Sequence, residues 1–470
     1  MFALFSLALA LTQAPGSTAS GRHLAALVEA INTRDSSAII RFGREHYSAS
    51  ALAASGGEAR LLERWLEIGT NYGLLELDSV LATTTVETTA WARGKISKAW
   101  LSFRLLGDSA EPHRVIRIGL GRGLRPPYAD ARAPVLTGAA LVSHIEDYLR
   151  RLAGEDLFSG VVLIVRNGRP VISRTYGFAD QARRTAFRMD TPFDIASTAK
   201  LFTAVAIGQL AERGALRLTD TIGKYIPELP PPLGRRITIA QLLEHSSGLG
   251  ELGPRLDSVM QRAVRVADMV GLLHDTTLAF PPGTSVLYSN RGYVLLGAVV
   301  ERAGGRPYAD YVRQEIFLPA GMTRTGLLQA AELPGDRARR YTRYPALRSG
   351  WTPGPRVEFS PEQDLAPGPH GGASSTAEDL VRFAAALTGG RLVSAAMLKQ
   401  MTEPQRGTGR SLGFQIGGGG VSAYFGHGGG APGMNSMLRV FPGLGYTVVI
   451  LSNYDSGANL AGAYITEVLR

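Results

Sequence analysis

The sequence predicts two folded regions of different class, a smaller α+β region at residues 22–125 and a larger α/β region at residues 137–470. The chain has 470 residues, more than the roughly 100–200 residues of one ordinary domain. In the first region helical patterns precede strand-like runs, as is typical of α+β folds. The second region has strand-like runs at both ends and helices between them. Because residues 121–135 are rich in Arg, Pro, Gly and Ala, we expect a linker at residues 126–136.

The smaller region opens with apolar residues at helical spacing, and strand-like runs follow. The spacing predicts a helix through Leu24, Leu27, Val28 and Ile31, and further helices at residues 39–47 and 59–72. Runs rich in Thr and Val predict strands at residues 74–90, 99–106 and 115–120. Helices before a curved sheet are similar in order to the NTF2-like fold, so the region is expected to be α+β and of that type.

The first twenty-one residues contain no charged side chain. An apolar run at residues 2–11 is followed by small and polar residues, which predicts a secretory signal peptide at residues 1–19, cleaved after Ala14 or Ala19. The run is too short to span a bilayer, so the mature chain is expected in the periplasm or secreted, without a transmembrane segment. The missing basic residues before the run leave a buried N-terminal helix as the alternative.

The larger region has predicted strands near both of its ends, each group flanked by a helix. A helix is expected at residues 139–152, followed by a hairpin of residues 160–165 and 170–176 around Asn167-Gly168, a strong hairpin signal. Three later strands are expected at residues 414–416, 436–440 and 446–451. A final helix is expected between the last strand and Arg470.

Composition excludes several kinds of chemistry. The chain has no Cys, so a thiol nucleophile, a disulfide and a Cys-ligated metal are excluded. The net charge is +10, but Arg alternates with Asp and Glu along the chain, which favours a solvated surface over nucleic-acid binding. Phosphate-binding glycine loops and metal-ligand His spacings are absent from the sequence. We therefore expect no cofactor, no metal and no nucleic-acid partner.

Ser197 and Lys200 form the first candidate for catalysis. They lie three residues apart at the start of a helical pattern, so their side chains share one face. A Ser hydroxyl needs a base to become a nucleophile, and a Lys with a lowered pKa can act as one. Free N–H groups at a helix N-terminus can also stabilise an oxyanion. Alone this pattern is weak, although only five lysines occur in the chain.

Two further elements follow in order along the chain. In Tyr288-Ser289-Asn290 the phenol could share proton transfer with Lys200, and the amide could hold a substrate or orient the Lys. In His427-Gly428-Gly429-Gly430 the missing side chains would let a strand backbone approach a substrate closely. Each of these elements alone is more simply explained as a turn or a loop.

Together the three elements resemble the serine β-lactamase and penicillin-binding-protein hydrolases, in particular the class C-type branch with esterases and D-aminopeptidases. The segments at residues 242–249, 281–283, 292–297, 319–322 and 371–380 are similar to other motifs of that family. The resemblance covers about residues 137–470. It implies a β-lactamase-like fold, an antiparallel sheet flanked by helices with a helical subdomain.

The resemblance also implies roles for individual residues. Ser197 would be the acylated nucleophile, with Lys200 and Tyr288 as the proton-transfer pair in which either could be the base. Asn290, His427, Gly428 and Gly429 would bind substrate. The backbone N–H groups of Ser197 and Gly430 would form the oxyanion hole.

One departure from the family pattern affects the expected substrate. Members active on β-lactams usually carry Lys-Thr/Ser-Gly where this chain has His427-Gly428-Gly429. Since imidazole is a weaker anion site than a permanent cation, we expect a serine hydrolase of ester, small amide or peptide substrates. The alternatives are a β-lactamase or D,D-peptidase, and an inactive binding protein of the same fold. The oligomeric state is left open.

Two other serine and histidine patterns compete with this hypothesis. Residues 409–413 match the Gly-x-Ser-x-Gly pattern around Ser411, but the buried strand that such an elbow needs is missing before it. His245 stands beside two serines, and we interpret it as a structural residue bonded within a loop.

Overall fold

The computed structural model describes residues 17–110, 112–122, 136–250, 266, 270, 277–328, 330–343, 355–360, 366–405 and 410–469. The apolar run at residues 2–11 and the expected linker, apart from residue 136, lie outside this part of the chain. The chain forms two compact units. The first comprises residues 1–157, 343–357 and 460–469, and the second comprises residues 158–342, 358–459 and 470.

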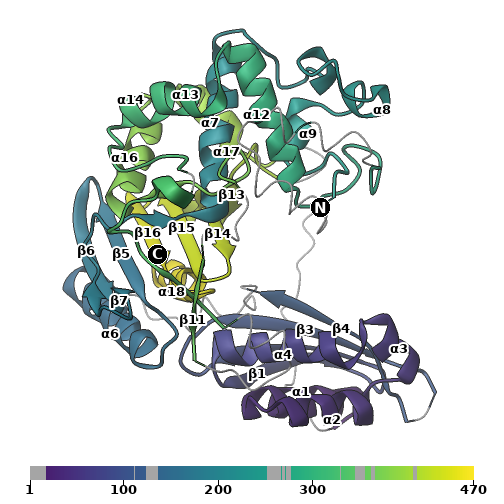
Figure 1. Cartoon of the computed structure of the whole chain (residues 1–470). Coiled ribbons are helices and arrows are strands. Elements are labelled where there is room, and N and C mark those ends of the chain that lie inside the picture. Colours follow the sequence, from purple (N-terminus) through teal and green to yellow (C-terminus); the bar gives the residue numbers. More distant parts are fainter. Residues whose placement is uncertain are drawn as a thin grey trace, which may run out of the picture. The chain divides into compact units, whose positions relative to one another are not determined.

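The first unit contains the expected helices followed by a sheet (Figure 1). Its helices are α1 (Ala19–Thr33), α2 (Ser36–His46), α3 (Ala49–Ala54) and α4 (Gly57–Tyr72). Its strands β1 (Leu75–Thr83), β2 (Glu87–Gly94), β3 (Trp100–Gly107) and β4 (Val115–Arg122) form an antiparallel sheet in that order. α3 was not expected, and the run at 74–90 is divided between β1 and β2. Two irregularities in β1 are of the kind that bends a sheet.

Polar contacts join this sheet to two later helices of the same unit, α6 (Gly138–Gly154) and the end of α18 (Gly457–Val468). The buried Tyr148 hydroxyl of α6 lies 2.5 Å from Ser97 O and 3.0 Å from Leu460 O. Glu467 of α18 accepts hydrogen bonds from Arg93 at 3.1 Å and from the Trp100 indole at 3.2 Å. The N-terminal sheet is therefore packed against helices from both ends of the larger sequence region.

The second unit is built on a six-stranded antiparallel sheet of order β13-β14-β15-β16-β5-β6. Its strands are β5 (Gly160–Arg166), β6 (Arg169–Tyr176), β13 (Gln415–Gly417), β14 (Tyr424–Ala431), β15 (Met434–Phe441) and β16 (Tyr446–Ser452). Asn167 and Gly168 have φ of 48° and 77°, as the expected two-residue hairpin turn requires. The sheet and the flanking helices confirm the predicted fold class.

Helices of the second unit pack on one another and on this sheet (Figure 1). α7 (Lys200–Glu212) is buried through Leu210 and lies against α12 (Asn290–Gly304), α13 (Tyr308–Val312) and α17 (Ala395–Thr402). α16 (Ala377–Thr388) covers β16 and β5. A helix that is apolar on all sides belongs in a core, so α7 gives its first residue, Lys200, a rigid support.

Short elements complete the second unit. They are β7 (Phe178–Asp180), β8 (Thr185–Ala186), β9 (Phe193–Asp194), η1 (Ala196–Ala199), η2 (Ile222–Lys224), α8 (Pro231–Gly234), α9 (Ile239–Leu243), the π-helical η4 (Arg313–Phe317), α14 (Leu318–Ala320), η5 (Ala330–Glu332), β10 (Arg340–Thr342), β12 (Ser374–Ser375) and η7 (Gly420–Ser422). β11 (Val357–Phe359) pairs with β10.

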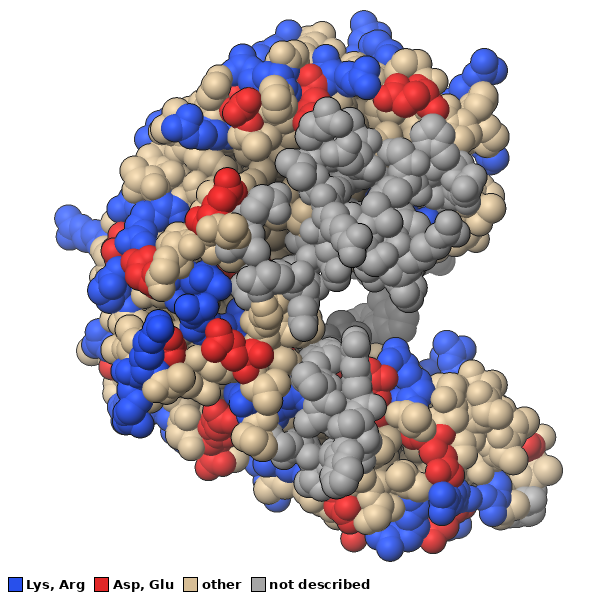
Figure 2. All heavy atoms as spheres, viewed as in Figure 1, with Lys and Arg blue, Asp and Glu red and all other residues tan. Residues whose placement is uncertain are grey.

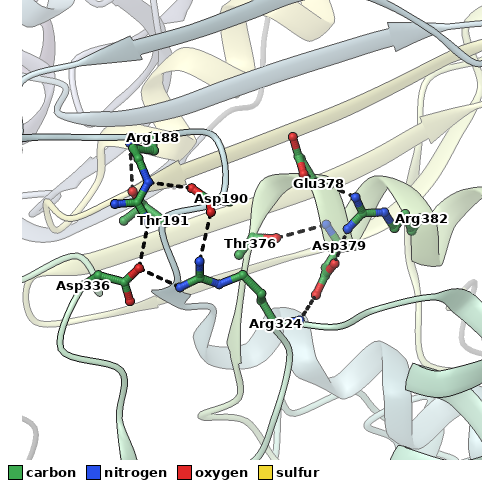
Figure 3. Close-up of polar contacts among 9 residues, drawn as sticks. All are labelled: Arg188, Asp190, Thr191, Arg324, Asp336, Thr376, Glu378, Asp379 and Arg382. Carbon is green, nitrogen blue, oxygen red and sulfur yellow. Dashed lines mark hydrogen bonds and ion pairs between the residues drawn. The ribbon is translucent and has the colours of Figure 1, made fainter.

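Charged side chains of both signs are interspersed on the face drawn in Figure 2. An ion-pair network joins the side chains of Arg188, Asp190, Arg324 and Asp336 (Figure 3). Each Arg of the network contacts both Asp residues. Because these four side chains are 33–57% exposed, solvent screening limits their contribution to stability.

Asp379, at the start of α16, is the fully buried carboxylate beside this network (Figure 3). It accepts hydrogen bonds from the Arg324 N–H at 2.8 Å, the Thr325 hydroxyl at 2.8 Å and the Arg382 guanidinium at 2.6 Å. The carboxylate therefore joins α16 to the loop that follows α14.

Asp379→Asn is expected to lower the free energy of unfolding by about 2 kcal/mol, because the amide nitrogen cannot accept and would lie, fully buried, against the donors that the carboxylate now satisfies. Urea denaturation measures the change. Glu378→Gln, on the adjacent exposed side chain, is the control and should change stability by less than about 0.5 kcal/mol. Equal effects of the two variants would contradict the structural role of Asp379.

In the part of the chain that the structure describes, no helix is long and apolar enough to cross a bilayer.

Candidate active site

Ser197 lies at a sharp corner between a short strand and the buried helix α7. β9 ends at Asp194, and Ser197 belongs to the 3₁₀ turn η1 that precedes α7. The preceding residue, Ala196, has φ of 45°, a conformation that is uncommon for residues other than glycine. Asp194 accepts a hydrogen bond from the Ala196 N–H at 3.0 Å. This strained corner, held by Asp194, places the Ser197 hydroxyl at the start of α7.

Lys200 is completely buried and its ammonium reaches three oxygen atoms. It donates to Ser197 Oγ at 3.2 Å and Asn290 Oδ1 at 2.6 Å, and it also donates to His370 O. Its Nζ lies 4.9 Å from the ring centre of Tyr288 and 5.1 Å from that of Tyr293. The ammonium is thus held by neutral oxygens and aromatic faces around the serine.

The Tyr288-Ser289-Asn290 segment lies at the N-terminal end of α12, beside Ser197. Tyr288 donates a hydrogen bond to Ser197 Oγ at 2.8 Å, and its side chain is 37% exposed. Ser289 caps α12 by accepting from the Gly292 N–H at 3.1 Å. Because α12 packs on α7, the cap brings Tyr288 and Asn290 to the residues at the start of α7.

The glycine-rich third element, residues 427–430, lies in strand β14 beside Ser197. A Cβ on Gly429 would lie 2.4 Å from Ile195 O and 2.8 Å from Ser197 N, so only glycine allows this approach. The Gly428 N–H donates to Gln415 Oε1 on the neighbouring β13 at 3.2 Å. Since backbone groups alternate in direction along a strand, the Gly430 N–H faces the same edge as that of Gly428.

His427 lies in β14 with its side chain buried. Its Nδ1 is 2.5 Å from Gly428 O. Burial, with a smaller effect from the charge of Lys200, lowers the pKa of His427 to about 4. The imidazole is therefore neutral near pH 7 and supplies no permanent cation at the third element.

Two further histidines near Lys200 have the same electrostatic character. Burial, and then the charge of Lys200, lower the pKa of His245 and of His370 to about 3. His370 Nδ1 is buried without a hydrogen-bond partner among the described residues. The site thus places one ammonium among three imidazoles that stay neutral at pH 7.

We expect these imidazoles to make the folded protein less stable in acid. The unfolded chain takes up protons at them as the pH falls through 6.5, whereas the folded chain takes them up only at about pH 3 to 4. Stability is thus highest above pH 6.5 and falls with pH, by up to about 1.4 kcal/mol per pH unit for each histidine. Urea denaturation between about pH 7.5 and pH 5 tests this. His370→Asn should flatten the dependence, and an unchanged free energy of unfolding would contradict the argument.

The structure brings together Ser197, Lys200, Tyr288 and Asn290 and sets the β14 glycines beside them. His427 is buried in the same strand, near enough to Lys200 for that charge to lower the pKa of its imidazole. The sequence did not predict that Lys200 donates to the His370 carbonyl, because a backbone carbonyl leaves no mark in a sequence. It also did not predict the contact between the rings of His245 and Tyr288. The competing Ser411 is buried in a turn, where its hydroxyl donates to Phe414 O. Among the described residues, no cluster of three His, Asp or Glu side chains could hold a metal ion.

Comparisons with known proteins show which family this chain resembles. Residues 145–469 match the sequence model of a family described as Beta-lactamase. Penicillin-binding protein 4 of Amycolatopsis lactamdurans is 29% identical over 356 residues, which are 70% of this chain and 88% of that protein.

Solved structures give the same result. A penicillin-binding protein from Bacillus halodurans is similar, with a TM-score of 0.60 and 28% identity over 70% of this chain and 99% of that one. A D-stereospecific amidohydrolase from Streptomyces sp. is similar, with a TM-score of 0.57 and 25% identity over 71% of this chain and 98% of that one.

Proposed function

The chain belongs to the beta-lactamase family of serine hydrolases, and from that premise we propose that it hydrolyses esters or small amides and peptides through an acyl-enzyme on Ser197. The observation that carries this proposal is the environment of Ser197 Oγ. It lies within hydrogen-bond distance of both the Lys200 ammonium and the Tyr288 hydroxyl. A serine between two proton-transfer groups is the arrangement that activates a hydroxyl for nucleophilic attack.

The proposed reaction has two steps. Ser197 Oγ attacks the substrate carbonyl and gives its proton to the Lys200–Tyr288 pair, which passes a proton to the leaving alcohol or amine. Water then attacks the acyl-enzyme and gives a proton to the pair. The bond from the acyl carbon to Ser197 Oγ breaks, the pair returns the proton to Ser197 Oγ, and the acid product leaves. Lys200 and Tyr288 are coupled, so the base is assigned to the pair rather than to either residue. Asn290 holds Lys200 and can accept or donate to a bound substrate.

Backbone N–H groups would stabilise the tetrahedral intermediate. Gly429 brings β14 against Ser197 N, and alternation along the strand points the Gly430 N–H to the same side of β14 as the Gly428 N–H. We assign the oxyanion hole to the N–H groups of Ser197 and Gly430. Two such donors pre-arranged around a developing charge contribute several kcal/mol to lowering the barrier, about 3 kcal/mol for each donor.

The third element favours substrates without a carboxylate at that position. A neutral His427 in place of a lysine gives weak attraction for the carboxylate of a β-lactam or of a D-Ala-D-Ala peptide. We therefore place short esters and small amides, including amino-acid amides, before β-lactams. β-Lactam or D,D-peptide hydrolysis is the second candidate, because relatives carry penicillin-binding-protein names.

A side-by-side assay tests the substrate class. p-Nitrophenyl butyrate, D- and L-amino-acid amides, a D-Ala-D-Ala peptide and nitrocefin are given to the wild type and to Ser197→Ala. We expect the ester to be turned over fastest and Ser197→Ala to lose all activities. A nitrocefin rate well above the ester rate would establish the second candidate. No turnover of any substrate would favour an inactive binding protein.

We also propose that the N-terminal apolar run directs export to the periplasm or the medium. Thr18 caps α1 by accepting from the Gly21 N–H at 3.2 Å. Cleavage after Ala19 would remove this cap, whereas cleavage after Ala14 would keep it. The mass of the chain recovered from the periplasm distinguishes the two sites. Full-length protein retained in the cytoplasm would contradict export.

A further inference from the structure

His245 occupies a backbone position that normally belongs to glycine. It follows the C-terminal end of α9, and its φ is 58°. Its N–H donates to Leu242 O at 3.2 Å, and the Ser246 N–H donates to Gln241 O at 2.8 Å. This pair of bonds is the Schellman helix end, whose left-handed residue is usually Gly because a Cβ is strained there. A histidine at this position is therefore disfavoured by local backbone energetics.

The same histidine holds the chain on both sides of Tyr288. Its carbonyl accepts from the Leu287 N–H at 2.9 Å, and its ring Nδ1 accepts from the Ser289 N–H at 3.1 Å. Its ring lies against the Tyr288 ring, with centres 4.4 Å apart and planes 31° apart. Backbone bonds to both neighbours and a ring contact together leave Tyr288 little freedom to turn.

We propose that His245 is the positioning residue for Tyr288, fixing its hydroxyl on Ser197 Oγ. This inference rests on the proposed acylation of Ser197 and names the residue that aims one member of its proton-transfer pair. Tyr288 needs such support because its side chain is 37% exposed, so packing alone holds it less firmly than it holds the buried Lys200. Misplacing a reacting group by about 1 Å can cost about 100-fold in rate.

The groups around His245 keep its ring in the accepting form. Lys200 on α7, His427 on β14 and Arg410 before β13 all oppose a positive charge on it, and burial opposes it most. Tyr293 packs on the ring at 5.2 Å together with Tyr288. With its pKa lowered to about 3, the imidazole carries its proton on Nε2 and accepts at Nδ1 over the whole neutral range.

Two variants separate the ring from the hydrogen bond. His245→Gly suits the backbone but removes both the ring and Nδ1. His245→Asn tolerates the left-handed conformation and places an amide oxygen near the position of Nδ1, without the ring. The rate of Ser197 labelling by a fluorophosphonate probe reports acylation without knowledge of the natural substrate. We expect labelling to slow by about 10- to 100-fold in His245→Gly, with His245→Asn between it and the wild type.

A double-mutant cycle with Tyr288→Phe tests whether His245 acts through Tyr288. If it does, His245→Gly with Tyr288→Phe labels no more slowly than Tyr288→Phe alone. Losses that multiply would overturn the proposal, as would a His245→Gly rate within about twofold of the wild type. Thermal unfolding checks that each variant is folded. If His245→Gly is not folded, the same double-mutant cycle is measured with His245→Asn in its place.

A matched control and the wild type complete the experiment. His113 is another buried histidine with positive φ, 56°, and it belongs to the other compact unit. His113→Asn should label at the wild-type rate, and a loss equal to that of His245→Asn would overturn the proposal by showing a general effect of destabilisation. An unlabelled wild type would instead refute the acyl-enzyme on Ser197 itself, so the two failures are distinguishable.

Discussion

Lys200→Met is expected to slow the acylation of Ser197 by about 1000-fold. The methionine side chain fills most of the buried space of the lysine but cannot donate or accept a proton as an amine does. Ser197 Oγ loses a hydrogen-bond partner at 3.2 Å, and Asn290 Oδ1 loses one at 2.6 Å. The buried His370 carbonyl also loses its hydrogen bond from Lys200, so stability should also fall, by about 1–3 kcal/mol.

Lys224→Met is the matched control for this prediction. Lys224, the last residue of η2, is 56% exposed and pairs with Asp220 at 2.7 Å, so its replacement should leave labelling within about twofold of the wild type and stability nearly unchanged. Stopped-flow or quenched labelling with a fluorophosphonate measures both rates. A Lys200→Met rate within tenfold of the wild type would mean that Lys200 is not part of the proton-transfer pair.

Gly429→Ala should slow acylation by about 100-fold or more and destabilise the protein by about 1–3 kcal/mol. The new Cβ would lie 2.4 Å from Ile195 O, 2.7 Å from Ser436 Oγ and 2.8 Å from Ser197 N. Two of these atoms are backbone atoms, so the overlap cannot be relieved by turning a side chain. β14 and η1 must separate, which moves the Ser197 N–H away from β14, the strand that carries the other N–H of the proposed oxyanion hole.

Gly419→Ala provides the comparison for this substitution. Gly419 has φ of −159° and no atom within 4 Å of an added Cβ, so its replacement should change neither rate nor stability. Labelling rates and urea denaturation on the two variants, measured together, give the result. If Gly429→Ala behaved like Gly419→Ala, β14 would not lie against the nucleophile as described.

Local sequence rules predicted those parts of the site that depend on local geometry. Ser197 and Lys200 are three residues apart, and their side chains meet as helical spacing requires. Asn167-Gly168 forms the hairpin turn for the same reason, because two residues with positive φ suit that loop. The contact of Tyr288 with Ser197 spans 91 positions, and only the resemblance to a family brought these two residues together beforehand.

Features that depend on tertiary packing could not be predicted in this way. The His370 carbonyl receives a hydrogen bond from Lys200, but every residue has a carbonyl and its side chain gives no signal. The burial of His427 is a second such feature. It lowers the pKa of the imidazole to about 4, whereas the sequence gives only the position of this residue in a strand. The role of His427 in binding substrate stays a prediction.

The division of strands was also difficult to predict from composition. The run at residues 74–90 is rich in strand-forming residues throughout, yet the chain turns between β1, which ends at Thr83, and β2, which begins at Glu87. The Thr84 hydroxyl accepts from the Glu87 N–H at 3.0 Å. A threonine that makes such a local bond ends a strand as a glycine or proline would, without their characteristic signal in the sequence.

Covalent labelling of Ser197 tests the central claim most directly. Wild type and Ser197→Ala are treated with a fluorophosphonate, and digestion followed by mass spectrometry locates the adduct. We predict one phosphonate on the peptide that contains Ser197, formed on the wild type and absent from Ser197→Ala. A wild type without adduct, or an adduct on another residue such as Ser411, would contradict the acyl-enzyme mechanism.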